Sequence, residues 1–137
     1  MKRYIFNYLP EFTRRGVVYR PVVLIYLKSR EKEWFAFRAY VDSGADVSLF
    51  MRSDSEMLGL DLYDGEYRPI VGIGKILIPA YMHNVEARIG ETIFKTSIAF
   101  ADSDEAPRLL GRMDIFKHFK ITFDEVNLQT IFEPCES

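Results

Sequence analysis

The sequence has a single cysteine, Cys135, and no long apolar run. One cysteine cannot form an internal disulfide, so a disulfide framework is excluded and a reducing compartment is the simplest interpretation. No segment approaches the roughly 20 apolar residues that a membrane-spanning helix needs. The apolar stretch at residues 4–9 stops at Pro10, which makes it too short for a signal peptide. We therefore expect a soluble, cytoplasmic protein.

An excess of charge of one sign is also lacking. The chain carries 18 Lys and Arg residues against 20 Asp and Glu residues, for a formal net charge of −2. Such a balance gives no broad attraction for phosphate backbones or anionic lipids. We expect neither a nucleic acid nor a membrane as partner.

Groups that bind metals or cofactors are scarce. The two histidines, His83 and His118, are isolated, so no cluster offers the three or four ligands of a zinc site. The glycines of residues 72–77 lack the third glycine of a dinucleotide loop, and no Gly-x-Ser-x-Gly nucleophile elbow occurs. We expect no metal and no cofactor.

Apolar and aromatic residues are plentiful: 48% of the 137 residues are apolar and 15% are aromatic. This length predicts one globular domain over residues 1–137. Three pairs of segments have the β-branched and aromatic composition of strands joined by polar or glycine-bearing turns. The pairs are residues 17–27 with 34–41, 67–71 with 75–78, and 85–89 with 92–100, and further strands are expected at 47–50, 121–123 and 128–132.

Two short helices are expected among these strands. Residues 53–56, Ser-Asp-Ser-Glu, match a capping box with the serine as N-cap, and Gly59 suits a left-handed stop. In residues 113–120 the apolar side chains fall on one helical face; they are Ile115, Phe116 and Phe119.

One stretch carries the clearest chemical signal, Tyr40-Val41-Asp42-Ser43-Gly44-Ala45-Asp46. An apolar strand delivers Asp42 into a turn, which places a carboxylate at the mouth of a β-structure, where it can activate water. Alone, Asp-Ser-Gly is a weak signal, because aspartate commonly caps amides in ordinary turns.

Two other segments follow this stretch in order. They are Val71-Gly72-Ile73-Gly74 in the second hairpin and Leu109-Leu110-Gly111-Arg112 before the second expected helix. Together the three segments resemble the retropepsin-type aspartic proteases, the family of retroviral proteases and their cellular relatives. The resemblance covers about residues 17–123. It implies a mostly β fold with two short helices: a single-lobe, closed β-barrel of the acid protease type.

The resemblance also implies roles for individual residues. Asp42 resembles the catalytic aspartate, Ser43 the hydroxyl residue that braces the two active-site loops, and Gly44 a site of close substrate approach. Ala45 and Asp46 complete the active-site loop. Asp46 and Arg112 resemble the family's ion pair beneath the site, which we expect to be buried rather than a surface pair. Structural support is expected from Gly111 and Arg112, and the flap from Val71, Gly72, Ile73 and Gly74.

The sequence has no second Asp-Ser/Thr-Gly, so one chain supplies one catalytic carboxylate. Aspartic protease chemistry needs two carboxylates about 3 Å apart that share a proton. A homodimer pairing two Asp42 residues is therefore expected, with residues 4–9 and 128–132 as candidate interface strands. Its peptide or unfolded polypeptide substrate would be cleaved by an activated water.

Other functions remain compatible with the same sequence. A catalytically inactive dimeric module that binds extended peptides or assists assembly would keep the fold without turnover. A third alternative is a self-processing enzyme embedded in a larger precursor. The leading hypothesis is the homodimeric aspartic endopeptidase.

Overall fold

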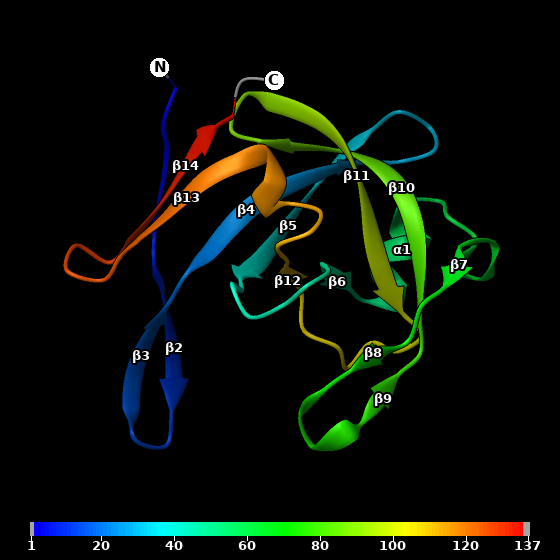
Figure 1. Cartoon of the computed structure of the whole chain (residues 1–137), viewed down its shortest axis with the longest axis horizontal. Helices are drawn as coiled ribbons and strands as arrows, with labels where there is room; N and C mark the ends of the chain where they lie inside the picture. Colours follow the sequence, from blue (N-terminus) through cyan, green and yellow to red (C-terminus); the bar gives the residue numbers. More distant parts are fainter. Residues whose placement is uncertain (1, 136–137) are drawn as a thin grey trace.

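The computed structural model describes residues 2–135, with the backbone alone at Ile73. Strands make up 53% of the structure and helices 11%. This composition confirms the prediction of a mostly β chain (Figure 1).

Two long hairpins form most of a barrel. Strand β4 (Val22–Lys28) pairs with β5 (Trp34–Val41) over seven residue pairs. Strand β10 (Ala80–Ile89) pairs with β11 (Thr92–Ala101), and Gly90 has the positive φ of 59° that their tight turn requires. Both hairpins were predicted, but the expected strand at residues 17–27 is divided at Pro21, because residues 17–20 belong to β3 (Gly16–Arg20).

Two short strands close the barrel. Strand β6 (Leu49–Phe50) runs parallel to β11, and β12 (Leu109–Leu110) runs parallel to β5 and antiparallel to β6. Together with the contact between β10 and β4, these pairings complete a closed barrel of six strands. Strand β7 (Glu66–Tyr67) is added at the edge of β10.

The two ends of the chain meet in a separate sheet. Its strand order is β1 (Tyr4–Asn7), β14 (Gln129–Pro134) and β13 (Phe119–Asp124), with all neighbours antiparallel. The segments expected as interface strands therefore pair with each other within one chain.

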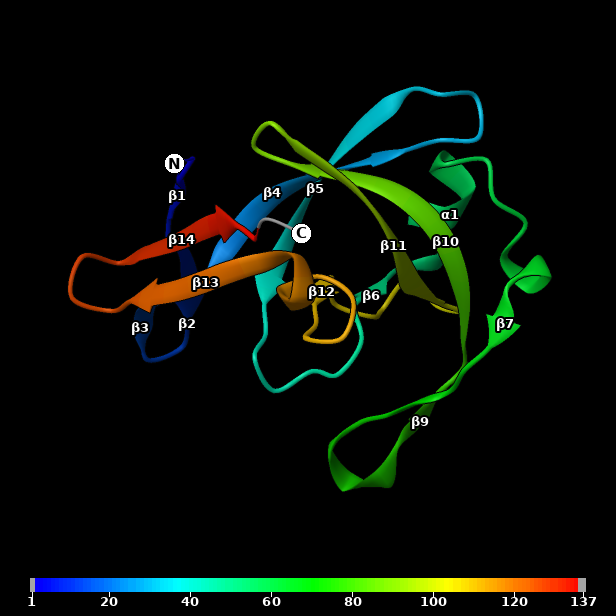
Figure 2. The same ribbon diagram turned by 45° about the horizontal axis from the view of Figure 1, so that its top comes forward.

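Two hairpins project from the body of the molecule (Figure 1). The first, here called the N-terminal hairpin, is formed by β2 (Leu9–Thr13) and β3 (Gly16–Arg20). The second is formed by β8 (Ile70–Val71) and β9 (Leu77–Ile78); it was predicted from residues 67–71 and 75–78, but Tyr67 belongs to β7 instead. In both views, the loop that follows β5 lies between these two hairpins (Figures 1 and 2).

The first predicted helix exists as α1 (Arg52–Met57), but its N-cap is Met51 instead of Ser53. The cap forms because an Asp54 side-chain oxygen accepts a hydrogen bond of 3.0 Å from the Met51 amide. The expected stop is confirmed: Gly59 has a φ of 72°.

The second predicted helix is wrong. The helical part of residues 113–120 is limited to the 3₁₀ turn η3 (Phe116–His118). Elsewhere in the chain, similar single turns occur at η1 (Leu62–Asp64) and η2 (Ile73–Lys75). Phe119 has the extended angles of −141° and 146° and begins β13, which pairs with β14. Ile115 and Phe119 are both buried in the core, so the apolar spacing reflects burial from a turn and a strand and not from one helical face.

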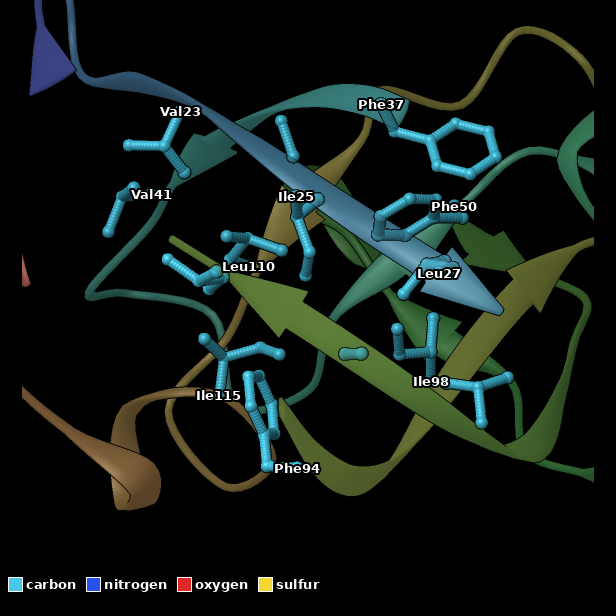
Figure 3. Packing of buried hydrophobic residues seen from close by; sticks show 14 of the residues in the cluster. Val23, Ile25, Leu27, Phe37, Val41, Phe50, Phe94, Ile98, Leu110 and Ile115 are labelled. Carbon is cyan, nitrogen blue, oxygen red and sulfur yellow. The ribbon is translucent and has the colours of Figure 1, made fainter. Parts of the chain in front are cut away.

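The core fills the barrel and extends under the terminal sheet. Aromatic rings meet edge to face, as with Phe37 and Phe50, whose centroids are 5.4 Å apart. Such contacts add to the stabilisation from apolar burial. Figure 3 shows the packed side chains, which include Val23, Ile25, Leu27, Val41, Phe94, Ile98, Leu110 and Ile115.

Candidate functional site

Asp42 lies directly after the last residue of β5, at the end of the barrel. Its amide donates to the Leu110 carbonyl at 3.0 Å, which continues the β5–β12 pairing by one step. One carboxylate oxygen accepts from the Gly44 amide at 2.9 Å, and the Asp42 carbonyl accepts from Ala45 at 3.2 Å. The backbone thus fixes the orientation of a carboxylate that remains partly exposed to solvent.

The turn after Asp42 is open on its outer side. Ser43, Gly44 and Asp46 are exposed, and Ala45 is half-buried. A Cβ atom on Gly44 would lie 3.3 Å from the Asp42 carboxylate, which is a tight contact. This turn presents small groups and a carboxylate on an accessible surface.

The inner side of the same loop is sealed by a buried aspartate. The Asp114 carboxylate accepts from the Ser48 amide at 2.7 Å and from the Ser48 hydroxyl at 2.5 Å. The Ser48 hydroxyl in turn accepts from the Gly111 amide at 2.8 Å. All three residues are buried, so this network joins two segments distant in sequence.

The environment of Asp114 changes its acidity. Burial raises the pKa of the Asp114 carboxyl above its usual value, and the Ser48 hydrogen bonds oppose this by favouring the ionised form. Burial has the larger effect. The Thr96 hydroxyl also donates to the Asp114 carbonyl at 2.9 Å, which fixes the backbone here to β11.

Gly111 has no room for a side chain. A Cβ atom at this position would lie 2.5 Å from the Val47 carbonyl carbon and 2.9 Å from the Ser48 nitrogen. Such distances are shorter than real contacts, so any larger residue must displace the backbone. Glycine therefore permits the two loops to touch.

The expected buried ion pair between Asp46 and Arg112 is not formed. Both side chains are exposed, and neither takes part in an ion pair within residues 2–135. Backbone bonds connect the segments instead: the Arg112 amide donates to Ala45 at 2.9 Å, and the Met113 amide donates to Asp46 at 2.8 Å. The prediction failed because the main chain and Asp114 already hold these loops together.

The hairpin expected to be the flap stands at the same end of the molecule as the Asp42 loop (Figure 2). The Gly72 amide donates to the Ile76 carbonyl at 2.8 Å, and Val71 is exposed. Positive φ values of 77° and 60° occur at Gly74 and Lys75. The tip therefore needs the conformational freedom of Gly74, as the glycines indicated.

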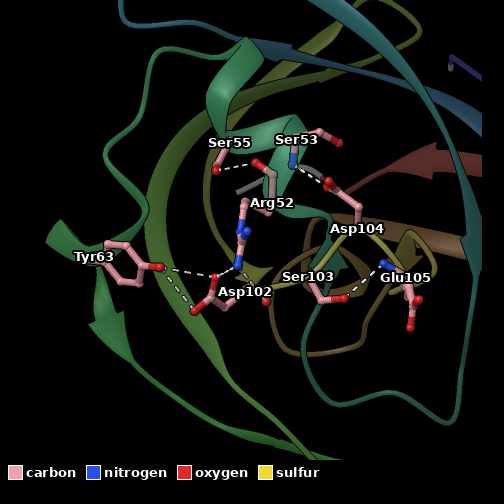
Figure 4. Close-up of polar contacts among 8 residues, drawn as sticks. All are labelled: Arg52, Ser53, Ser55, Tyr63, Asp102, Ser103, Asp104 and Glu105. Atoms are coloured by element: carbon pink, nitrogen blue, oxygen red, sulfur yellow. Dashed lines mark hydrogen bonds and ion pairs between the residues drawn. The ribbon is translucent and has the colours of Figure 1, made fainter.

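The polar loop at residues 102–105 is tied to α1 (Figure 4). Arg52 forms an ion pair with Asp102, whose carboxylate also accepts from the Tyr63 hydroxyl at 3.2 Å. Asp104 accepts from the Ser53 amide at 2.8 Å, and this bond lowers the pKa of its carboxyl. These polar contacts attach the loop to α1 and to Tyr63.

A second ion pair supports the same helix. Arg108 binds Asp54 through two hydrogen bonds of 2.9 and 3.0 Å, and Asp54 is almost fully buried. Bidentate geometry makes this pair stronger than a surface pair. The Arg108 carbonyl accepts from the Tyr40 amide at 2.9 Å, so the pair is linked to β5, the strand that immediately precedes Asp42.

Sequence reasoning missed Ser48, Asp54, Arg108 and Asp114 as supporting residues. Ser48 offered one signal, because a polar residue within the apolar segment 47–50 requires a buried partner. Its partner lies 66 positions away, and no local pattern identifies it.

The described part of the chain shows no cluster of three or more His, Cys, Asp or Glu side chains arranged to hold a metal. None of its helices is long and apolar enough to cross a membrane.

The closed barrel, with an Asp-Ser-Gly turn at its end, has the fold of retropepsin-like aspartic proteases. A retropepsin-like aspartic protease from Rickettsia conorii matches with a TM-score of 0.66 and 21% identity, covering 96% of this chain and 98% of that chain. The EIAV protease, complexed with the inhibitor HBY-793, matches with a TM-score of 0.52 and 21% identity, covering 68% and 82%. The chain is therefore retropepsin-like in its fold, which confirms the predicted architecture.

Two curated relatives are similar in sequence. The first is DNA damage-inducible protein 1 of Yarrowia lipolytica (strain CLIB 122 / E 150), 33% identical over 97 residues, which cover 68% of this chain. The second is Protein DNA-DAMAGE INDUCIBLE 1 of Arabidopsis thaliana, 29% identical over 113 residues, which cover 80% of this chain. The matched regions are 23% and 27% of the relatives, so the chain spans about a quarter of their length. No protein-family model matches the chain.

Proposed function

We propose that this protein is a homodimeric aspartic endopeptidase. The observation that carries the proposal is the Asp42 carboxylate, which the backbone fixes at the end of β5 while leaving it open to solvent. The retropepsin-like fold supports this assignment.

The proposed chemistry uses one Asp42 from each chain. Two carboxylates within about 3 Å cannot both be ionised, so they share a proton. The ionised carboxylate removes a proton from a water held between them, and the water oxygen attacks the scissile carbonyl. The protonated carboxyl donates a hydrogen bond to the carbonyl oxygen as negative charge develops there. The tetrahedral intermediate then collapses: the C–N bond breaks, and the carboxyl that took the proton from water gives it to the leaving nitrogen.

A second chain is needed because one chain supplies one carboxylate to the site. A two-fold axis places identical side chains opposite each other, which is the simplest way to pair Asp42 with its own copy. A hollow of about 680 Å³ is lined by Val47, Met113 and Asp114 with residues of β10 and β11, and Asp42 does not line it. The proposed substrate cleft lies between the two chains, where the two Asp42 carboxylates face each other.

The surrounding residues receive roles within this proposal. Ser43, Gly44, Ala45 and Asp46 form the loop beside the bound peptide. The β8–β9 hairpin acts as the flap through Val71, Gly72, Ile73 and Gly74. An extended peptide would pair with backbone groups of this hairpin, as peptides do at exposed strands. Gly111 and Arg112 support the loop from the second segment.

The decisive experiment compares Asp42→Asn with Asp64→Asn. The first change removes the proposed base, whereas Asp64 is an exposed residue of η1 and serves as a matched control. Hydrolysis of an unfolded polypeptide at mildly acidic pH should be lost only in Asp42→Asn, with the dimer still folded. Undiminished cleavage by Asp42→Asn would contradict the mechanism.

A statine-type transition-state mimic separates this function from the inactive peptide-binding module. The peptidase should bind the mimic more tightly than a peptide of the same sequence, because the mimic reproduces the tetrahedral geometry. Stoichiometric peptide binding without turnover, and without preference for the mimic, would favour the module instead.

A further inference from the structure

The N-terminal hairpin, residues 9–20, stands apart from the sheets of the body. Its two strands pair with each other and with no other strand among residues 2–135. All five residues of β3 are exposed. Figures 1 and 2 show the hairpin extending beyond the barrel.

The two faces of this hairpin differ in chemistry. Side chains alternate between faces along a strand, and residues opposite each other share a face. Because Pro10 pairs with Tyr19 and Phe12 pairs with Val17, these four side chains form one face. All four are exposed, and Phe12 retains 82% of its accessible surface. This group is called the outer face.

The opposite face is mixed, with Leu9 and Val18 beside Glu11 and Arg20, and it is attached to strand β5, which leads to Asp42. Glu11 forms a 2.7 Å ion pair with Arg20 and accepts a 3.3 Å hydrogen bond from the Tyr40 hydroxyl. At the base of the hairpin, the Val41 amide donates to the Pro21 carbonyl at 2.8 Å. These contacts hold the hairpin against the two residues that immediately precede Asp42.

A contiguous apolar patch on a projecting element is a sign of an interface. From the area of 150–250 Å² for an aromatic side chain, the outer face exposes roughly 350 Å² of surface. Two such faces, each covered by an equal area of a partner, would bury about 1,400 Å², which is in the range of a stable protein–protein interface. The patch is thus large enough to matter to a symmetric dimer.

We propose that the N-terminal hairpin is a dimerisation arm whose outer face packs on a second copy of this chain beside the Asp42 loop. This inference rests on the proposed function, since the Asp42 site is incomplete without a second chain. The arm and the β8–β9 hairpin stand on either side of the loop that carries Asp42 (Figure 1). A second chain that faces Asp42 is therefore within reach of the arm. Because Glu11 of the arm bonds the Tyr40 hydroxyl, contact between the two chains at the arm also helps to position the residues next to Asp42.

The first test replaces Phe12 and Tyr19 together by threonine, which preserves strand propensity. The matched control is Val126→Thr, because Val126 is 91% exposed and lies between β13 and β14, away from the arm. Sedimentation equilibrium should show at least a tenfold rise in the dimer dissociation constant for the double variant alone, as expected for loss of aromatic anchors. An unchanged dissociation constant would overturn the proposal, and weaker peptide binding in the same variant would assign the outer face to substrate.

A second measurement uses the unaltered protein and does not depend on how the variant folds. Amide hydrogen exchange in residues 9–20 should slow as protein concentration rises through the dimer dissociation constant. Exchange that is independent of concentration, or a protein that stays monomeric, would contradict the arm. If the proposed catalytic function were wrong but the arm proposal correct, the protein would show no Asp42-dependent cleavage while the arm variant still weakened dimerisation.

Discussion

The two sides of the Asp42 loop place their carboxylates in opposite environments. On the outer side, Asp42 is partly exposed and its carboxylate accepts from the Gly44 amide. On the inner side, Asp114 is 5% exposed and its carboxylate accepts two hydrogen bonds from Ser48. The same residue type is thus open to solvent on one side, where we propose that it acts on substrate, and attaches the loop on the other.

The difference indicates how the site combines access with rigidity. Substrate can reach only groups that remain open, and such groups contribute little to stability. The buried network of Ser48, Gly111 and Asp114 supplies the fixed base that an exposed turn lacks. We therefore expect activity to depend on the Asp42 loop and stability to depend on the buried network that attaches it to residues 111–114.

The largest expected effect comes from exchanging each carboxylate for an amide. Asp42→Asn should lower cleavage about 10³-fold, the usual scale for losing a general base, and change the free energy of unfolding by less than about 0.5 kcal/mol. Asp114→Asn should keep the cleavage rate within about tenfold, because this carboxylate bonds Ser48 and not substrate. Initial rates and urea midpoints check both. Equal losses of cleavage activity in Asp42→Asn and Asp114→Asn would contradict the assignment of chemistry to Asp42 and of loop attachment to Asp114.

A large loss of stability is expected from Gly111→Ala. The new methyl group would overlap the Val47 and Ser48 backbone, and overpacking of this kind should lower the free energy of unfolding by about 2–3 kcal/mol. Gly72→Ala is the matched control, because its Cβ would lie 3.6 Å from the nearest carbonyl at an ordinary φ of −89°. Denaturant unfolding measures both changes. Equal stability of the two variants would show that the loops can separate without cost.

Removing one partner from the buried network should have a moderate effect. Ser48→Ala and Asp114→Ala should each cost about 1–3 kcal/mol, because each leaves buried polar groups without a partner. The double variant should cost less than the sum of the two, since both changes remove the same hydrogen bonds. A double-mutant cycle measures this coupling. Full additivity would mean that the Ser48–Asp114 bonds do not act as one unit.

A smaller effect is expected in the pH dependence of stability. Because burial raises the pKa of Asp114 above its usual 3.8, the folded state holds this proton more tightly than the unfolded state. The contribution is fully present below the unfolded pKa and is lost as pH rises through the folded pKa. The stability of the wild type relative to Asp114→Asn should therefore decline as pH rises above the usual value of 3.8 and through the raised pKa of the folded state. A difference that increases with pH would reverse the assigned direction.

The smallest effect is expected at Arg112, which does not form the predicted buried ion pair with Asp46. Arg112→Ala should change the free energy of unfolding by less than about 0.5 kcal/mol, because its side chain is exposed and only its backbone amide contacts the Asp42 loop. Thermal unfolding of the single variant checks this. If the free energy of unfolding fell by more than about 1 kcal/mol, the Arg112 side chain would have to form an ion pair with Asp46 in solution, and the outer side of the loop would also contribute to stability.

Local patterns predicted much of the fold. The hairpins β4–β5, β8–β9 and β10–β11 follow from strand composition and turn residues over short spans. Asp42 stood out because strand and turn adjoin in sequence. In residues 113–120 the apolar spacing was ambiguous, and pairing of Phe119 with the chain end decided against a helix.

The supporting contacts of the site could not be predicted in the same way. Ser48 with Asp114, and Asp54 with Arg108, join residues 66 and 54 positions apart. These residues meet only because the closed barrel brings distant segments of the chain together. The expected Asp46–Arg112 pair joined the correct segments but assigned to side chains a contact that the backbone makes.

The order in which the chain is made gives the contact between these segments one more consequence. The Asp42 loop forms backbone hydrogen bonds with Leu110, Arg112 and Met113. These partners are synthesised about 70 residues after Asp42, so the loop cannot form its contacts until that part of the chain has been made. Contacts between such distant positions also form late during folding, because a long loop must close first. A nascent or truncated chain that ends before Leu110 would therefore carry Asp42 without the backbone contacts that position its loop.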